Sequence, residues 1–397
     1  MPEQTSPASK AIDDLIDRLV GLKGSIDSDP KASDEAISLS KSLIHHLEKP
    51  EKMALDMIYA PFTPIAARIA VEMNLFRYIS EKGGPITSHE LASLSGGEEE
   101  LIIRLLRVLV PVGLLDEVGE RTWEAKPVTH AMASEGIAAG YRMVGEILMT
   151  GAQQSPKYLR NNGYRCPTDP RAGFIQYAFN TDLTTFELIS TMPDTFRDFN
   201  AFMGREVGAR KKWLEWYDVS GRLMHDARQD VPLLVDVGGG KGHDLVRFLG
   251  VHPGVGRLVL QDLETVLHLA PQLPSEIEKM PYDFFTVQPV KGARAYFFHH
   301  IFHDWSDYKS LEILEQVVKA MTPGYSKLLI HEMVVPEKGA GIVHATLDIA
   351  MMCFGGGKER TAKQWKELLA GAGLTISGIW PGPEAGAAGI IEAMVVV

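Results

Sequence analysis

The apolar positions in the first half of the chain recur at helical spacing. Residues 1–45 read as a polar tail followed by an amphipathic helix. From residue 53, "MALDMIYAPFTPIAARIAVEMNLFRYISEKGG" predicts helix, interrupted by Pro61 and Pro64 and ended by Gly83 and Gly84. Helical, aromatic and methionine-rich sequence returns over residues 150–220, where core packing and an exposed substrate wall are both compatible with the pattern.

Between these helical stretches, residues 86–128 predict a different arrangement. A short helix begins at about Ser88, a Gly96–Gly97 turn follows, and a longer helix runs to about Val112. A strand, a turn containing Gly119 and a second strand come next. Helix–turn–helix followed by a β-wing is the winged-helix pattern.

From Pro232 the pattern changes to strands alternating with helices, which predicts an α/β fold with a mostly parallel, Rossmann-like, doubly wound sheet. The last two strands, joined by "PGPEAGAAG", predict a hairpin that adds an antiparallel strand. The expected strands are "PLLVDV", "RLVLQD", "YDFFTV", "RAYFFHH", "SKLLIHEMVV", "TISGIW" and "IIEAMVVV". We therefore expect a polar tail and helix (1–45), a winged-helix dimerisation domain (46–150), a helical connector that also forms a wall of the acceptor pocket (151–225) and a catalytic domain (226–397).

Composition narrows the choice of partners and compartment. Nucleic acid and anionic membranes are disfavoured by the formal net charge of −11 over 397 residues. The longer helix of the winged-helix segment also begins with Glu98, Glu99 and Glu100, so we expect a protein-interaction or dimerisation role and not DNA binding. Two cysteines, no secretory leader and short apolar runs favour a cytoplasmic protein with no membrane span.

A glycine-rich loop follows the first expected strand of the catalytic domain. "LLVDVGGGKGHD" does not match the dinucleotide-binding pattern G-x-G-x-x-G, because His243 stands at the position of the third glycine. It does not match the P-loop either, because Gly242 stands where Ser or Thr is required. Asp236 precedes the loop, and Asp262 ends the next strand, where an acid suits hydrogen bonds to ribose hydroxyls. A nucleoside without phosphate, such as S-adenosylmethionine (SAM), fits this combination.

The stretch "FFHHIFHDWSD", residues 297–307, contains three histidines within five positions. A metal site needs about three convergent ligands. His299 and His300 are adjacent on an expected strand, so their side chains should point to opposite faces. We therefore expect no metal here, whereas His303 remains either a general base or a capping residue at a helix start.

In this order, "RIAVEMNLF", "FIQYAFNTD", "LVDVGGGKGHD", "LQDL", "YDFF", "FHHIFHDWSD", "LLIHEMVVP", "LDIAMMCFGGGKERT" and "LAGAGL" resemble SAM-dependent O-methyltransferases of the caffeic-acid type, particularly fungal secondary-metabolite members. The resemblance runs from about residue 45 to the C-terminus. It implies a homodimer formed through the winged-helix domain, SAM as cofactor, S-adenosylhomocysteine (SAH) as product, and a small aromatic acceptor.

The resemblance also implies residue roles. His303 matches the general base of "HDW", and Glu332 and Glu359 match its flanking glutamates, either of which could hold the second ring nitrogen. Met351, Met352 and Phe354 match the helix that lines the acceptor site, although core packing is as compatible. The implied cofactor set is Asp236, Gly238, Gly239, Gly240, Asp262, Leu263, Asp283, Phe284 and His299, of which His299 stands where the family usually has lysine or a similar polar residue.

The expected reaction is methyl transfer to a phenolic or enolic hydroxyl of an aromatic or polyketide-type natural product. A phenol with a pKa of about 10 keeps its proton at neutral pH, so a histidine base is useful. Two alternatives remain. One is a pericyclase-like relative that binds SAM without transferring methyl, and the other is a SAM-binding regulatory protein.

Overall fold

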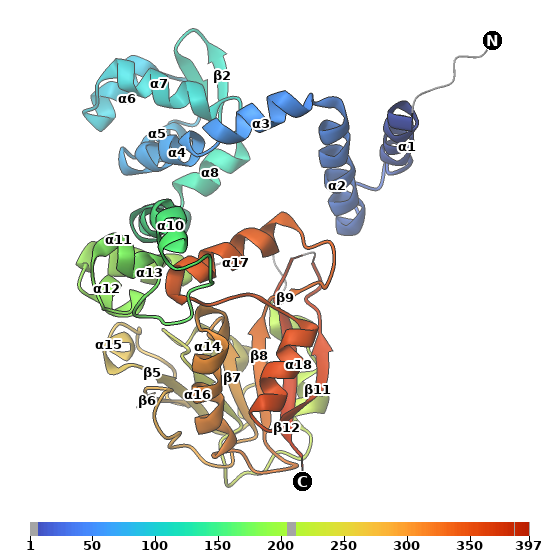
Figure 1. Cartoon of the computed structure of the whole chain (residues 1–397). Coiled ribbons are helices and arrows are strands. Elements are labelled where there is room, and N and C mark those ends of the chain that lie inside the picture. Colours follow the sequence, from blue (N-terminus) through green and yellow to red (C-terminus); the bar gives the residue numbers. More distant parts are fainter. Residues whose placement is uncertain (1–6, 205–211, 385, 397) are drawn as a thin grey trace, which may run out of the picture. The chain divides into compact units, whose positions relative to one another are not determined.

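The computed structural model describes residues 7–204, 212–384 and 386–396, and the chain divides into two compact units, Met1–Thr129 and His130–Val397 (Figure 1). In chain order, the elements of the first unit are α1 (Pro7–Gly21), α2 (Pro30–Leu47), α3 (Pro50–Tyr59), α4 (Phe62–Glu72), α5 (Leu75–Lys82), β1 (Ile86–Thr87), α6 (Ser88–Ser95), α7 (Glu99–Leu109), β2 (Asp116–Gly119) and β3 (Thr122–Glu124), with α8 (Pro127–Ala133) crossing the division.

The first unit contains the predicted winged helix. Strands β1, β3 and β2 form an antiparallel sheet in that order, with Ile86 opposite Trp123. Leu91 of α6 and Leu106 of α7 are fully buried and supply its core. The second helix ends at Leu109, slightly before the expected end, and Thr87 caps α6 through a reciprocal capping box with Glu90.

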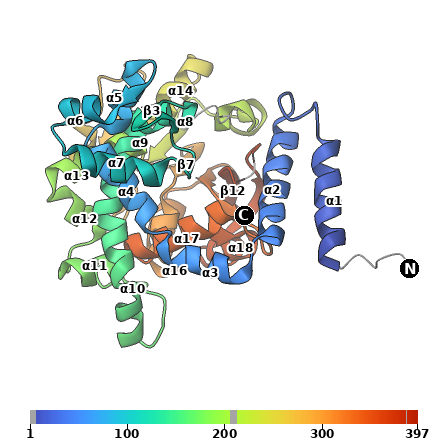
Figure 2. The same ribbon diagram turned by 90° about the horizontal axis from the view of Figure 1, so that it is seen from above.

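Two features precede the winged helix. Helices α1 and α2 lie side by side as an antiparallel pair (Figure 2). Helices α3 and α4 together form one segment, Pro50–Glu72, that is long and apolar enough to cross a membrane by length and composition, contrary to the expectation from its shorter uninterrupted apolar runs. Ala67 and Ala70 of α4 pack in the unit's core, whereas none of the described residues of α3 is buried.

The second unit begins with helices and continues as the alternating sheet domain. Its elements are α9 (Glu135–Met143), η1 (Val144–Leu148), α10 (Met149–Asn161), α11 (Phe174–Phe179), α12 (Thr185–Ser190), α13 (Pro193–Met203), η2 (Trp213–Glu215), η3 (Ser220–Met224), β4 (Leu234–Val237), α14 (His243–Val251), β5 (Leu258–Asp262), α15 (Glu264–Leu267), β6 (Ile277–Pro281), β7 (Ala295–His299), η4 (Phe302–Asp304), α16 (Asp307–Val318), β8 (Lys327–Glu332), β9 (Val334–Val335), α17 (Ile342–Gly355), β10 (Arg360–Thr361), α18 (Ala362–Gly371), β11 (Leu374–Trp380) and β12 (Gly389–Val395).

The main sheet is mostly parallel, as predicted. Its seven strands run in the order β11-β12-β8-β7-β4-β5-β6, and the strands from β8 to β6 are parallel (Figure 1). Strand β12 is antiparallel to both β8 and β11, which confirms the terminal hairpin. Parallel strands bring their carboxyl ends to one edge, where ligands bind in such sheets.

Helices and connecting segments bury both faces of this sheet. On one face, α16 and α18 pack through Ile313, Leu314 and Trp365 against side chains such as Phe298 and Ile330. The other face packs against α14 and the residues before β4, among them Trp213, Tyr217 and Phe248. Burial of both faces explains why the parallel strands read as nearly continuous apolar runs.

Two expectations need correction. The strand beside β5 is "IEKMP" (Ile277–Pro281), whereas "YDFFTV" forms a turn in which Asp283 Oδ1 accepts the N–H of Phe285 at 3.0 Å. An Asp that satisfies a nearby backbone N–H favours a turn over a strand. Residues 130–150, which the sequence pattern assigned to the winged-helix domain, lie in the second unit, where α9 packs on α13 through the Arg142–Asp198 ion pair.

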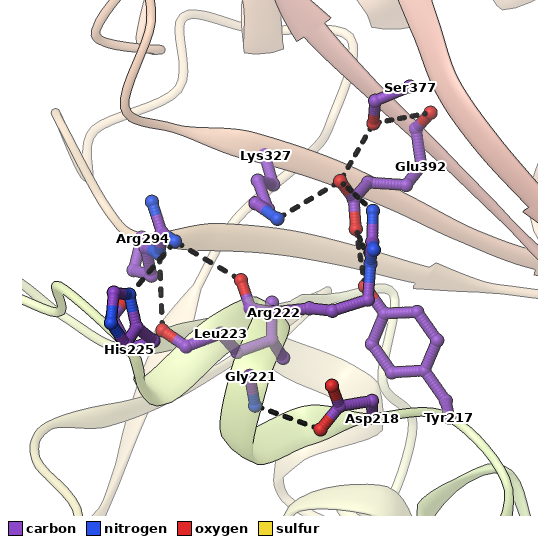
Figure 3. A network of polar contacts seen from close by, with 10 residues as sticks. All are labelled: Tyr217, Asp218, Gly221, Arg222, Leu223, His225, Arg294, Lys327, Ser377 and Glu392. Carbon is purple, nitrogen blue, oxygen red and sulfur yellow. Dashed lines mark hydrogen bonds and ion pairs between the residues drawn. The ribbon is translucent and has the colours of Figure 1, made fainter.

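A buried polar network fastens the segment before β4 to the sheet (Figure 3). Glu392 of β12 is 1% exposed and accepts hydrogen bonds from Tyr217 (2.6 Å), Arg222 (2.9 and 3.1 Å), Ser377 (2.7 Å) and Lys327 (3.0 Å). Burial disfavours the carboxylate, but these donors outweigh burial and lower the pKa of Glu392 to about 2.

We expect Glu392→Gln to reduce the free energy of unfolding by about 3–5 kcal/mol at neutral pH, because Lys327 and Arg222 lose their buried partner. A lowered carboxyl pKa contributes stability above the unfolded value, and that contribution is lost as pH falls from 4.5 toward about 2. Urea unfolding across this range should therefore show the two proteins converging in acid. Glu367→Gln, at an exposed position, is the matched control, and equal effects of both substitutions would contradict the prediction.

Candidate active site

The glycine loop lies at the carboxyl end of β4, in the centre of the parallel sheet. Gly238 has a φ of +72°, and a Cβ built there would lie 2.6 Å from Cδ1 of Ile301. A Cβ on Gly239 would lie 2.5 Å from Cγ of Asp236. Side chains at these positions would be strained or would collide with neighbours, so glycine leaves the backbone open to a ligand.

The carboxyl groups of Asp262 and Asp236 lie beside this loop. Asp262, at the end of β5, accepts the N–H groups of Gly240 (2.8 Å) and Leu263 (2.7 Å). Burial raises the pKa of Asp262, and the two N–H groups oppose that effect. Asp236 is 1% exposed, and neither of its carboxyl oxygens has a hydrogen-bond partner among the described residues.

The turn after β6 brings Asp283 and Phe284 to the same region. Asp283 holds the turn by accepting the N–H of Phe285. Phe284 Cε1 lies 3.7 Å from a Cβ built on Gly238, so its ring flanks the glycine loop. Leu263, at the start of α15, is 49% exposed.

His299 is the last residue of β7, at the carboxyl edge of the parallel strands. Its Nδ1–H donates to Oδ2 of Asp244 at 2.7 Å, and Asp244 also accepts the Trp213 Nε1–H at 3.1 Å. Burial disfavours ionised Asp244, but His299 outweighs burial and lowers the pKa of Asp244. Burial and the neighbouring His299 both lower the pKa of His331, so His331 is held neutral.

The prediction that His299 and His300 point to opposite faces is wrong. Their ring centroids lie 4.6 Å apart, because the strand ends at His299 and His300 has a φ of +54°. The left-handed residue breaks the alternation of side chains along the strand. His300 therefore turns toward His303, with 5.1 Å between the ring centroids and 24° between the planes.

His303 is buried on η4, the short 3₁₀ turn after β7. Its Nδ1 lies 2.7 Å from Oε1 of Glu359, and a carboxylate can only accept there, so Nδ1 carries the proton and Nε2 faces away. Oδ1 of Asp304 lies 3.7 Å from that Nε2. Burial disfavours the imidazolium, but Asp304, Glu359 and Glu332 outweigh burial and raise the pKa of His303 to about 9. Burial raises the pKa of Asp304 to about 7.

The two glutamates beside His303 have different partners. Glu359 contacts the imidazole ring, whereas Oε1 of Glu332 accepts the backbone N–H groups of Ile301 (3.1 Å), Phe302 (2.6 Å) and His303 (3.2 Å). Of the two glutamates that could bind the second ring nitrogen of His303, Glu359 makes the hydrogen bond. Glu332 instead fixes the backbone that carries His303.

Arg360 completes the support of this turn, and the sequence reasoning overlooked it. Its guanidinium is fully buried and donates to the carbonyl oxygens of Phe302 (2.9 Å) and Trp305 (2.8 Å). It also contacts Oδ1 of Asp307 at 3.0 Å. A basic residue directly after Glu359 in "KERT" was the available signal, but a charged loop residue reads as solvated without the fold.

An aromatic cluster from distant segments lies beside the turn. Phe186 of α12 meets Phe354 of α17 with ring centroids 4.9 Å apart, and it also stacks on Trp305 at 6.2 Å. Met351 and Phe354 are 8% and 5% exposed within a cluster that also packs Met352 and Phe199. The predicted acceptor-side residues are therefore packed together, and Phe186 joins them from α12, within the helical stretch that was considered as a substrate wall from the sequence.

A metal site does not accompany these groups. Among the residues 7–204, 212–384 and 386–396, no cluster of three or more His, Cys, Asp or Glu side chains is arranged to hold a metal ion. His299, His300 and His331 are close, but they meet through ring faces, with centroids 4.2 Å apart for His299 and His331.

Comparisons with known proteins identify the family. Residues 173–375 match the O-methyltransferase domain and residues 56–135 the O-methyltransferase dimerisation domain. The chain is 45% identical to O-methyltransferase penC of Penicillium thymicola over 92% of each chain. It is 48% identical to O-methyltransferase asqD of Emericella nidulans, over 84% of this chain and 87% of the relative.

Solved structures agree in fold over nearly the whole chain. The structure of LepI in complex with SAM has a TM-score of 0.88 at 31% identity, covering 97% of this chain and 99% of that one. A structure described as a pericyclic reaction enzyme has a TM-score of 0.87 at 31% identity, with the same coverage. The chain belongs to the family of SAM-dependent O-methyltransferases of fungal natural-product pathways.

Proposed function

We propose that this protein methylates a phenolic or enolic hydroxyl of an aromatic or polyketide-type natural product. SAM is the methyl donor and SAH the product. The observation that carries the proposal is the buried His303–Glu359 pair, with Nδ1 and Oε1 2.7 Å apart. Ile301 lies two residues before His303 and contacts the glycine loop. The segment that carries the proposed base therefore also lies against the proposed cofactor site.

The residues around the glycine loop fit SAM. The loop leaves backbone exposed to a ligand, and Asp236 offers a buried carboxyl without a hydrogen-bond partner among the described residues. Asp236, Asp244 and Asp262 make an acidic surrounding that suits a cofactor with sulfonium and ammonium cations. When bound, SAM supplies an electrophilic methyl group that already carries its own leaving group.

The chain's own groups would then manage the acceptor proton. Neutral His303 has its Nε2 lone pair available, because Nδ1–H is held by Glu359. Nε2 removes the hydroxyl proton as oxygen attacks, and Glu359 stabilises the resulting imidazolium. Alignment of acceptor and methyl group can contribute up to about 7–11 kcal/mol. The cluster of Phe186, Phe199, Phe354 and Trp305 suits an aromatic acceptor.

Other assignments follow from the same proposal. We assign a homodimer formed through the domain at residues 56–135, in which α3 and α4 expose Met57, Ile58, Tyr59 and Phe62. Several large exposed apolar side chains within one short segment are typical of a protein–protein interface. We also assign a cytoplasmic location and a small-molecule acceptor, with neither nucleic acid nor membrane as partner.

A second candidate function is a SAM-binding pericyclase-like activity without methyl transfer. The similarity to a structure described as a pericyclic reaction enzyme favours it. The raised pKa of His303, about 9, also favours it, because an imidazolium at neutral pH can donate a hydrogen bond to a substrate carbonyl. SAM binding without label transfer to any member of a broad phenol panel would support this alternative.

We expect His303→Gln to lower methyl transfer by about 10²–10⁴-fold, because the hydroxyl proton loses its acceptor. The assay follows radiolabelled methyl from SAM to a panel of phenols. His225→Gln removes a largely exposed imidazole and is the control. Full transfer by folded His303→Gln protein would contradict the assignment of the base.

The rate should also depend on pH. Because Asp304, Glu359 and Glu332 raise the pKa of His303 to about 9, the proton-accepting form increases with pH up to that value. We expect kcat/KM to rise by about tenfold per pH unit and to level near pH 9. Glu359→Gln removes one of these charges and should move the rising limb to lower pH. An unmoved limb in that variant would show that another group titrates.

Metal chelation distinguishes proton transfer by His303 and Glu359 from a metal-assisted mechanism. Because His303 and Glu359 perform the proton transfer in this proposal, EDTA should leave label transfer unchanged. Loss of transfer on EDTA treatment, restored by Mg²⁺, would replace this mechanism with a metal-assisted one.

A further inference from the structure

Three carboxyl groups adjoin the glycine loop, but they are not equally supported. Asp262 accepts two backbone N–H groups, from Gly240 and Leu263. Asp244 accepts from His299 and Trp213. Asp236 has neither kind of support, because both of its oxygens are buried without a hydrogen-bond partner among the described residues. Of these three carboxyl groups, that of Asp236 is the one without a hydrogen-bond partner among the described residues.

The position of Asp236 directs its carboxyl group at the cofactor side. It is the penultimate residue of β4, between Leu260 of β5 and Phe297 of β7 in the sheet register. A Cβ built on Gly239 would lie 2.5 Å from Cγ and Oδ2 of Asp236. The carboxyl therefore lies directly against the backbone of the loop that a SAM molecule would contact.

An ionised carboxylate in this position is unfavourable in the free protein. Removing such a charge from water costs several kcal/mol unless a partner compensates. The charged groups that bear on Asp236 are the carboxylates of Asp244 on α14 and Asp262 on β5, and both repel it. His299 compensates Asp244. Burial and these two neighbours raise the pKa of Asp236 well above its ordinary value, which favours the neutral acid over the carboxylate.

We propose that binding of SAM is coupled to the release of the Asp236 proton. The inference rests on the cofactor assigned in the proposed function. The O–H bond of the neutral acid breaks, the electron pair stays on Asp236, and the proton passes to the buffer. The cationic cofactor then faces a carboxylate, and the pair supplies the compensation that the free site lacks.

Proton linkage makes this measurable without turnover. Titration calorimetry of the full chain with SAM, in two buffers of different ionisation enthalpy, gives the number of protons released at neutral pH. We expect net proton release on SAM binding by the wild type and a measurably smaller release by Asp236→Asn. His303 also titrates, so His303→Gln is the matched control and should retain the Asp236 contribution.

The outcomes separate the inference from the function on which it rests. Wild-type protein that gives no saturable heat with SAM would refute the cofactor assignment itself. Saturable binding with no proton release, or with equal release in wild type and Asp236→Asn, would refute only the coupling.

A second measurement avoids the variant, in case Asp236→Asn does not fold. Infrared difference spectra of the wild type should show loss of a protonated carboxyl band when SAM is added. An unchanged band would overturn the proposal.

Discussion

A short turn of backbone between β7 and α16 carries the proposed base, and two buried charges of opposite sign fix this turn. A 3₁₀ turn has poor internal hydrogen bonds, so its conformation must be held by other groups. Glu332 accepts its N–H groups, and Arg360 donates to its carbonyl oxygens. The position of His303 relative to the glycine loop depends on this pair of contacts.

The segment that contains Glu359 and Arg360 both supports the turn and orients the imidazole ring of His303. Glu359 and Arg360 are neighbours, and β10 pairs with β9, which closely follows Glu332. One end of this small sheet therefore delivers both the partner of His303 Nδ1 and the donor to the surrounding carbonyls. A displacement of β10 would change ring orientation and backbone support together, so the two contacts act as a unit.

Buried charges have different surroundings at His303 and at the glycine loop. Around His303, carboxylates gather near a group that can become a cation, and the attraction raises its pKa. Around the glycine loop, carboxylates gather near each other, and Asp236 has no compensating group within the described residues. A cationic cofactor fits the second arrangement and would also oppose the protonation of His303, since like charges repel. Ile301, two residues before the proposed base, also lies against the glycine loop.

The sequence by itself determined the mostly parallel sheet with its terminal hairpin, the winged helix and the glycine loop, because periodicity and loop chemistry are local properties. The resemblance to a family, and not periodicity, pointed to His303, Glu332 and Glu359. The sequence pattern misassigned "YDFFTV" and the faces of His299 and His300, since a local turn and one left-handed residue override strand alternation. Only the tertiary structure decided that Glu359 and not Glu332 contacts the imidazole, that Arg360 is buried, and that Asp236 lacks a partner among the described residues. These outcomes depend on contacts between residues far apart in the chain, and on burial, which sets the energy of a charge but leaves no periodic mark in the sequence.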